Sequence, residues 1–175
     1  GRYDFHPDGA ISREYYISNH DQPNPKSVGI VLEDMHNVIF DGQGAELIFH
    51  GRMLPVAVVD CSDCTVRNLS IDFANPHISQ VRVVKNDPEA GMITYEVAPW
   101  VEYEIRDSTF VAKGEGWEHV PAWGIAFEGD TRHVLYNSGD ISLGTRGVTE
   151  VAPRTILAPW RNEALAEGTV VAFRG

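Results

Sequence analysis

The sequence predicts an all-β protein in two parts, a stack of parallel β-helix coils followed by an antiparallel sandwich or barrel. Three observations lead to this prediction. Helical periodicity is almost absent from the 175 residues. Short runs of β-branched and aromatic residues are separated by Gly, Asn, Asp and Pro, which is typical of strands and turns. The first half of the chain also contains an internal repeat.

The repeat has a period of 26 residues and brings apolar residues onto apolar residues. One such period cannot bury its apolar face alone, so successive periods are expected to stack like on like. A period of this length with strands and no helix predicts a parallel β-helix, with Cys61 and Cys64 pointing inward beneath Met35 and Val38. The apolar pairs that this shift brings together are Val28/Leu54, Ile30/Val56, Leu32/Val58, Met35/Cys61, Val38/Cys64, Phe40/Val66, Ala45/Ile71 and Leu47/Phe73.

The individual strands follow from the same apolar runs. A change of pattern near Asn75-Pro76, with a hairpin signal over residues 86–91, divides the chain into β-helix coils over 1–78 and a β-barrel-like domain over 79–175. One short helix is expected over residues 162–166. The strands are expected at residues 28–32, 37–42, 45–51, 55–60, 64–73, 80–84, 92–97, 109–113, 123–128, 133–136 and 168–175.

Composition excludes several classes of function. The 14 Lys and Arg against 25 Asp and Glu give a net charge of −11, which argues against nucleic acid and anionic membranes as partners. The cysteine pair Cys61 and Cys64 has no second Cys or His pair at a matching spacing, so no metal site is predicted. Gly42-x-Gly44 precedes a strand rather than a helix, and no cofactor is expected.

Three segments point to a family. They are Ser18-Asn19-His20-Asp21-Gln22, then Ile48-Phe49-His50-Gly51-Arg52-Met53, and Asn68-Leu69-Ser70-Ile71-Asp72-Phe73. Over about residues 1–80 the chain resembles the N-terminal portion of the glycoside hydrolase family 110 enzymes. These are inverting, exo-acting α-1,3-galactosidases that release terminal galactose from blood-group-B-type and linear α-galactosyl glycans.

The resemblance implies a right-handed parallel β-helix interrupted by a β-barrel-like insertion. It also implies a secreted or periplasmic protein whose partner is a galactose-terminated glycan, and it leaves a homo-oligomer open. The catalytic carboxylates of the family lie on later coils, beyond Gly175. No residue of this chain is therefore expected to act as the catalytic acid or base.

The expected substrate contacts are polar residues of the first two segments, and His77, to which the third segment leads through Asn75-Pro76. Asn19, His20 and Asp21 offer the donors and acceptors that sugar hydroxyls need, beside prolines that fix the loop. Arg52 follows a glycine at a coil bend, and His77 stands at the start of the second domain. The alternative for all five is structural, as polar groups that hold turns and neighbouring coils together.

Other functions remain open at this point. Asp41 and Asp72 lie at strand ends on different coils and could form an inverting pair of carboxylates, although aspartates at such bends usually cap turns. The chain could instead be a non-catalytic carbohydrate-binding or adhesion module, or part of a polysaccharide lyase of similar architecture. Four tryptophans after residue 79 fit either a core or a sugar-stacking surface.

Overall fold

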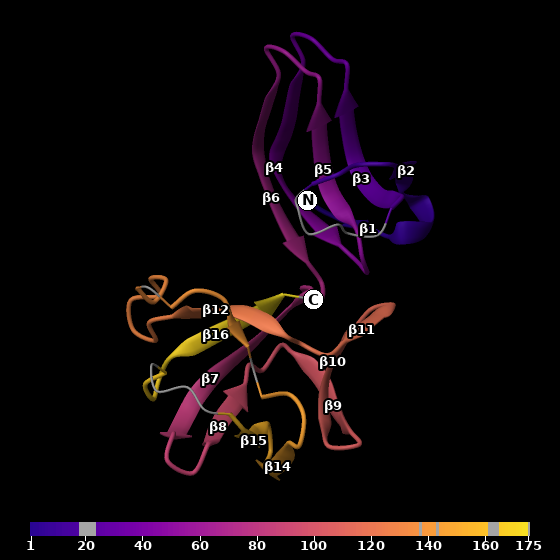
Figure 1. Ribbon diagram of the computed structural model, residues 1–175. Helices are drawn as coiled ribbons and strands as arrows, with labels where there is room; N and C mark the ends of the chain where they lie inside the picture. Colours follow the sequence, from indigo (N-terminus) through magenta and orange to yellow (C-terminus); the bar gives the residue numbers. More distant parts are fainter. Residues whose placement is uncertain (18–23, 137, 143, 161–164, 175) are drawn as a thin grey trace. The chain divides into compact units, whose positions relative to one another are not determined.

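The computed structural model describes residues 1–17, 24–136, 138–142, 144–160 and 165–174. Over these residues the regular structure is β-strand apart from one 3-10 turn, so the all-β prediction is confirmed. The helix expected at 162–166 falls mostly outside the described residues. The chain forms two compact units, Gly1–Pro76 and His77–Gly175, which run from indigo to magenta and from magenta to yellow in Figure 1. In the described part of the chain, no helix has the length and apolarity needed to cross a membrane.

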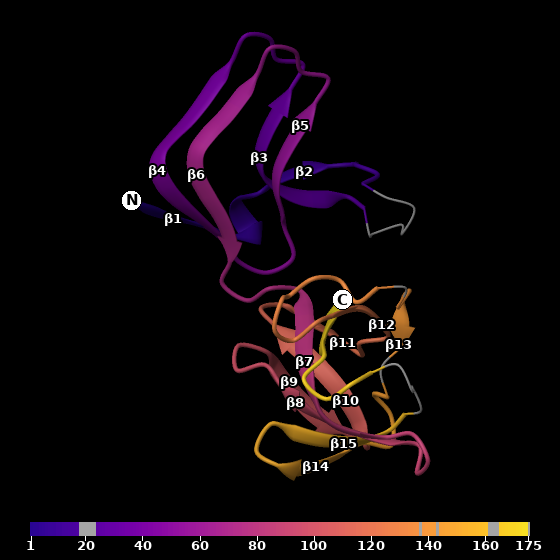
Figure 2. The ribbon, with the colours of Figure 1, turned by 90° about the vertical axis from the view of Figure 1, so that its left-hand side faces the viewer.

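The first unit consists of two three-stranded sheets (Figure 2). One sheet has the order β1-β4-β6 and is parallel throughout. In the other, of order β2-β3-β5, β3 and β5 are parallel and β2 is antiparallel to β3. The elements are β1 (Arg2–Phe5), the 3-10 turn η1 (Pro7–Gly9), β2 (Ile11–Arg13), β3 (Lys26–Glu33), β4 (Ile39–Phe49), β5 (Leu54–Val59) and β6 (Thr65–Phe73).

The register of the first unit matches the 26-residue repeat along β3 and at the start of β4. Ile30 pairs with Val56 on the neighbouring parallel strand, and Phe40 pairs with Val66 in the same way. The turns repeat as well, since Asp34 and Asp60 both adopt positive φ, at 53° and 50°. The predicted stacking of like residue on like residue is therefore present in both sheets.

The register changes in the middle of β4. Beyond an irregularity between Asp41 and Ala45, Ala45 pairs with Leu69 and Leu47 with Ile71, so the offset falls from 26 to 24 residues. The predicted pairs Ala45/Ile71 and Leu47/Phe73 are therefore wrong. Strand β4 forms a bulge that accommodates two extra residues there, with Gln43 at φ 50°. An even slip keeps the apolar side chains on the inner face, which an odd slip would not do.

The two cysteines lie in the turns rather than in the core. Both thiols are free and only half-buried. The sulfur of Cys61 lies 3.4 Å from the carbonyl oxygen of Leu32, and that of Cys64 lies 3.4 Å from the carbonyl oxygen of Met35. The pairing of His36 with Ser62 and of Ile39 with Thr65 keeps the 26-residue offset, so Cys61 and Cys64 do lie beside Met35 and Val38 as predicted. Neither belongs to the buried core, so the expected inward orientation is not confirmed. Each thiol contacts a backbone carbonyl of the preceding repeat and one two residues earlier in the chain.

A column of phenylalanines fills the core of the first unit. Phe5, Phe49 and Phe73 occupy matching positions on β1, β4 and β6. The rings of Phe5 and Phe49 stack with centroids 4.7 Å apart, and those of Phe49 and Phe73 lie 6.1 Å apart. Phe49 is fully buried and its ring crosses Gly29, where a Cβ atom would lie 2.4 Å from the ring. Glycine at position 29 thus allows the two sheets to approach.

The second unit is antiparallel throughout. A seven-stranded sheet has the order β13-β12-β16-β7-β8-β15-β14, and a three-stranded sheet has the order β11-β10-β9. The strands are β7 (Ile78–Asp87), β8 (Met92–Val97), β9 (Glu102–Arg106), β10 (Thr109–Gly114), β11 (Trp117–His119), β12 (Trp123–Phe127), β13 (Ile141–Ser142), β14 (Thr149–Ala152), β15 (Thr155–Pro159) and β16 (Val170–Arg174).

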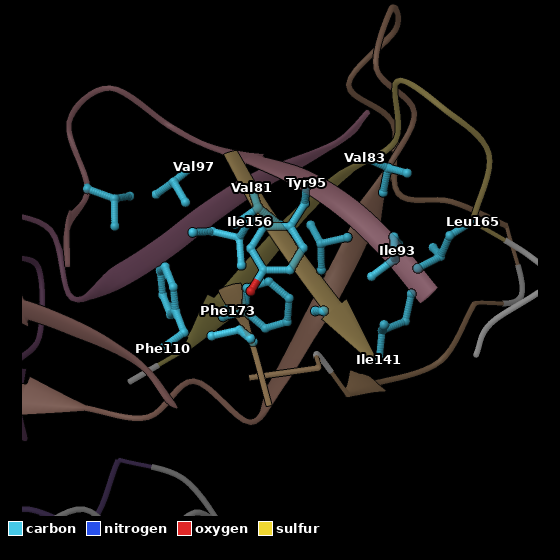
Figure 3. Packing of buried hydrophobic residues seen from close by; sticks show 14 of the residues in the cluster. Val81, Val83, Ile93, Tyr95, Val97, Phe110, Ile141, Ile156, Leu165 and Phe173 are labelled. Atoms are coloured by element: carbon cyan, nitrogen blue, oxygen red, sulfur yellow. The ribbon is translucent and has the colours of Figure 1, made fainter. Parts of the chain in front are cut away.

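One apolar core lies between these strands. Tyr95, Phe110, Ile156 and Phe173 are fully buried and meet in its centre, as Figure 3 shows. The Tyr95 hydroxyl donates to the carbonyl oxygen of Gly144 at 3.3 Å, and burial raises the pKa of this phenol. The core therefore includes side chains from both sheets.

The side chain of Arg154 forms hydrogen bonds to the connection between β8 and β9. Its guanidinium donates to the carbonyl oxygens of Val97 at 3.1 Å, Val101 at 2.7 Å and Ala98. It also lies over the ring of Tyr103, 5.3 Å from the centroid. One side chain thus satisfies several carbonyl groups that no strand pairing serves.

Removing the central ring of the phenylalanine column should weaken the first unit. We expect Phe49→Ala to lower the free energy of unfolding by about 3–5 kcal/mol, because it leaves a large cavity between two packed sheets. Val58→Ala, at an exposed position of β5, is the control and should change it by no more than about 0.5 kcal/mol. Urea unfolding monitored by circular dichroism measures both. Equal effects of the two substitutions would contradict the assigned core.

Removing the guanidinium of Arg154 should destabilise the second unit. We expect Arg154→Met to cost about 2–3 kcal/mol, because it retains much of the aliphatic volume but removes the guanidinium donors from the carbonyl groups of Val97 and Val101 and leaves that of Ala98 with the Val101 amide alone. The exposed Arg146→Met provides the matched control. Thermal unfolding of both variants, together with exchange of the amide hydrogens of Ala98, Trp100 and Val101, measures the effect. Unchanged exchange in this connection would contradict the assigned role.

Candidate functional site

Three of the expected substrate contacts belong to one segment, and a hydrogen bond links the residues on either side of that segment. Asn19, His20 and Asp21 themselves lie outside the described residues. On either side of them the backbone amide of Tyr15 donates to the side-chain oxygen of Asn24, at 3.2 Å. This contact fixes the two ends of the segment close together in the first unit.

Hydrogen bonds from Tyr15 and Arg13 to Glu33 hold the residues before this segment against β3. The Tyr15 hydroxyl donates to one oxygen of Glu33 at 2.8 Å, and Arg13 donates to the other at 3.0 Å. These two hydrogen bonds, that from Tyr15 first, hold the pKa of Glu33 below its usual range. Desolvation, followed by the Glu33 interaction, raises the pKa of the Tyr15 phenol. Glu33 is therefore an ionised acceptor that anchors the chain rather than a proton donor.

The other two expected contacts belong to different units. Arg52 is exposed in the turn between β4 and β5, directly after Gly51, which has φ 64°. His77 is half-buried at the start of the second unit. Its ring meets Trp117 edge-on, with centroids 5.4 Å apart and an interplanar angle of 82°.

His77 is one end of a row of three rings, His77, Trp117 and His119, which we call the aromatic row. Trp117 and His119 lie nearly parallel, 5.2 Å apart at 24°. The indole of Trp117 lies directly on Gly114 of β10, where an added Cβ would come within 2.3 Å of a ring carbon. Glycine at this position thus lets the indole lie flat on the strand. Trp117 also packs against the apolar core of the second unit, and its Nε1 is buried.

A second group of polar residues lies where β1 and β4 end in the first unit. Arg2 grips Asp4 with two nitrogens, Nη2 at 2.7 Å from Oδ1 and Nε at 3.0 Å from Oδ2. His50 Nε2 lies 2.9 Å from Oδ1 of the same carboxylate, and its ring stacks on that of His6 with centroids 4.2 Å apart. We call these four residues the strand-end cluster.

The electrostatics of the strand-end cluster favour an ionised carboxylate. The hydrogen bonds from Arg2 and then from His50 hold the pKa of Asp4 far below its usual range. The same contact raises the pKa of Arg2. A carboxylate in this state can accept hydrogen bonds and orient an imidazole, but it cannot donate a proton near neutral pH.

Asp41 and Asp72 have the contacts of structural carboxylates. Asp41 accepts hydrogen bonds from Asn68 at 3.0 Å, from the amide of Gln43 at 3.0 Å and from Arg67 at 2.9 Å, and these lower its pKa. Asp72 accepts from the amide of the next residue at 2.8 Å. Asp41 pairs with Arg67, five positions before Asp72 on β6. At about 3.3 Å per residue, five positions exceed the roughly 6.5–9.5 Å that inverting hydrolysis requires.

The described part of the chain contains no candidate metal site. No set of three or more His, Cys, Asp or Glu side chains there is arranged to hold an ion. The strand-end cluster does not qualify because Arg2 already occupies its carboxylate.

A family comparison identifies the second unit. The family described as GLAA-B β-barrel domain I matches residues 79–171, more than half of the chain. The chain belongs to this GLAA-B β-barrel domain family. The prediction of a β-barrel domain is thereby confirmed.

The full length of the chain also matches curated members of this group. It is 63% identical to an α-1,3-galactosidase B of Parabacteroides distasonis over 99% of the chain, and 59% identical to one of Phocaeicola vulgatus over 100%. An α-1,3-galactosidase A of Bacteroides fragilis is 34% identical over 87% of the chain. These matches cover only 29%, 30% and 26% of the relatives. The resemblance to α-1,3-galactosidases is confirmed, and the GLAA-B chain corresponds to a part of such a protein.

Sequence reasoning missed the strand-end cluster and the aromatic row. Asp4 and His50 are 46 residues apart, and no spacing links them. The one available signal was the match of Tyr3-Asp4-Phe5-His6 to Leu47-Ile48-Phe49-His50 at an offset of 44, which differs from the repeat period. Trp117 and His77 meet only after the antiparallel sheets have formed.

The pKa of Asp4 tests the strand-end cluster. We expect Arg2→Ala to raise it toward the usual range, because Arg2 is the largest cause of the shift. A depressed folded-state pKa stabilises the fold above the unfolded value, and this contribution is lost as pH falls through the folded value. Carboxyl titration by NMR in both proteins gives the direct measurement. An unchanged pKa in Arg2→Ala would rule out the described contact.

Proposed function

We propose that this chain is part of an exo-acting α-1,3-galactosidase that releases terminal α-galactose from glycans. The main support is 63% identity over nearly the whole chain to a protein named α-1,3-galactosidase B. Four relatives at 58% identity or more carry that name. The substrate class is accordingly a galactose-terminated glycan, and a secreted or periplasmic location and a homo-oligomeric state belong to the same proposal.

The first unit is proposed to be part of a right-handed parallel β-helix. Two coils with matching turns and parallel pairing support this architecture. Strands β5 and β6 are edge strands of the two sheets, and Val58 of β5 and Val66 and Ile71 of β6 are exposed. Apolar residues on an unpaired parallel edge are what a further coil would cover. The β-barrel is then an insertion between coils.

Within this enzyme the chain would supply substrate contacts rather than the catalytic acid and base. The proposed contacts are Asn19, His20 and Asp21 of the anchored segment, Arg52 after β4, and His77 of the aromatic row. The carboxylates of Asp4 and Asp41 are held ionised by arginine and amide donors. An inverting glycosidase needs one carboxylic acid that keeps its proton, and these two do not suit that role.

A chimaera tests this function directly. We expect the P. distasonis relative, with its matching region replaced by these 175 residues, to release galactose from an α-1,3-galactosyl disaccharide. The isolated chain should not release it. A folded but inactive chimaera would contradict the proposed function, and turnover by the isolated chain would show that the catalytic pair lies within it.

The same chimaera tests the substrate contacts. We expect Arg52→Ala and His77→Ala each to raise KM about tenfold with a smaller change in kcat, because each removes one contact to a bound sugar. Arg146→Ala is the matched control and should leave both constants unchanged. Variants that behave like the control would remove these two residues from the proposed site.

A further inference from the structure

Four residues around positions 18–23 of the first unit form a hydrogen-bonded group, which we call the brace. They are Arg13 at the end of β2, Tyr15, Asn24, and Glu33 at the end of β3. Backbone pairing places Arg13 beside Lys26, the first residue of β3, whereas its guanidinium donates to Glu33, the last residue of that strand. The brace therefore connects both ends of β3 to the chain that leaves β2.

The brace fixes geometry more than it stabilises the fold. The side chains of Arg13 and Glu33 are 42% and 33% exposed, and an ion pair exposed to this degree contributes little to the free energy of unfolding. The hydrogen bonds are nevertheless directional, and the two oxygens of Glu33 receive different donors, the Tyr15 hydroxyl at 2.8 Å and the Arg13 guanidinium at 3.0 Å. These contacts restrict the backbone that leads into positions 18–23.

The other side of the same positions is restricted as well. The backbone amide of Tyr15 donates to the side-chain oxygen of Asn24 at 3.2 Å, so the residues before and after positions 18–23 are linked directly. A displacement at Tyr15 would therefore move both ends of this short stretch. Such a displacement matters for a binding residue, since a hydrogen bond to a ligand tolerates only about 2.7–3.2 Å between nitrogen and oxygen.

We propose that Tyr15, Glu33 and Arg13 are positioning residues for the glycan substrate, because they fix the ends of the stretch that contains Asn19, His20 and Asp21. This inference rests on the proposed function, in which those three residues contact a terminal galactose. The brace itself does not touch the sugar. Its loss should weaken substrate binding, since a misplacement of about 1 Å is enough to impair contacts to a bound substrate.

The chimaera with the P. distasonis relative allows the test, and Tyr15→Phe is the first variant because it removes only a hydroxyl group. We expect it to raise KM for an α-1,3-galactosyl disaccharide about five- to tenfold, with less than about a twofold change in kcat. Its melting temperature should stay within about 2 °C of that of the parent. Tyr16→Phe is the matched control, since the neighbouring Tyr16 is 77% exposed, and it should leave KM unchanged.

Substitutions of Glu33 test the other half of the hydrogen bond. Glu33→Ala should raise KM at least as much as Tyr15→Phe does, because both donors lose their acceptor. Glu33→Gln keeps an oxygen that can accept from the Tyr15 hydroxyl and should restore most of the lost affinity. Equal KM values for Glu33→Gln and Glu33→Ala would contradict the inferred role of this bond.

Double-mutant cycles show whether Tyr15 acts through the neighbouring stretch. Tyr15→Phe is combined in turn with Asn19→Ala, His20→Ala and Asp21→Ala, and kcat/KM is measured for each pair. At least one pair should depart from additivity by about threefold or more, because the second substitution removes a contact that the first has misplaced. Additivity in all three cycles, or a KM for Tyr15→Phe equal to that of Tyr16→Phe, overturns the inference while the proposed function stands. An inactive but folded parent chimaera contradicts the proposed function, and this inference with it.

Discussion

Parallel pairing in register is the constraint on which the first unit depends. Residues 46–49 of β4 lie beside counterparts on both β1 and β6, so side chains at the same level of the sheet are neighbours and have to pack together. Phe5, Phe49 and Phe73 form the apolar column, and Gly29 provides the space that the central ring needs. The bulge after Asp41 changes the register by two residues, which preserves the inner face. A change of one residue would have placed Leu47 in water.

The same pairing gathers polar groups that are remote in sequence. Because β1 and β4 run in the same direction, the residues that follow them leave the sheet at the same end. His6 and His50 therefore stack, and Asp4 reaches His50 across 46 residues of chain. The topology of a parallel sheet brings these residues together at one end of the sheet. The sequence then determines only which side chains stand there.

The sequence predicted the architecture where the repeat is unbroken and failed where it is interrupted. Ile30 over Val56 could be found because both strands keep the 26-residue period. Strand β1 could not, because η1, β2 and the segment up to residue 25 lengthen its offset to 44. The pairing of Leu47 with Ile71 was hidden by the bulge. In the β-barrel no period exists, so the contact of His77 with Trp117 depends on the folded sheets.

The charge state of the carboxylates limits what the chain can contribute to glycoside cleavage. A general acid must keep its proton near neutral pH, which requires burial or a neighbouring negative charge to raise its pKa. Among the described residues, every carboxyl group with a shifted pKa is shifted downward by hydrogen bonds from arginine, lysine, tyrosine, amide or imidazole groups. These residues are Asp4, Glu33, Asp41, Glu104, Glu118 and Glu150. Such carboxylates hold turns and strands in place. A group that keeps its proton near neutral pH requires a different environment from that of these six carboxylates.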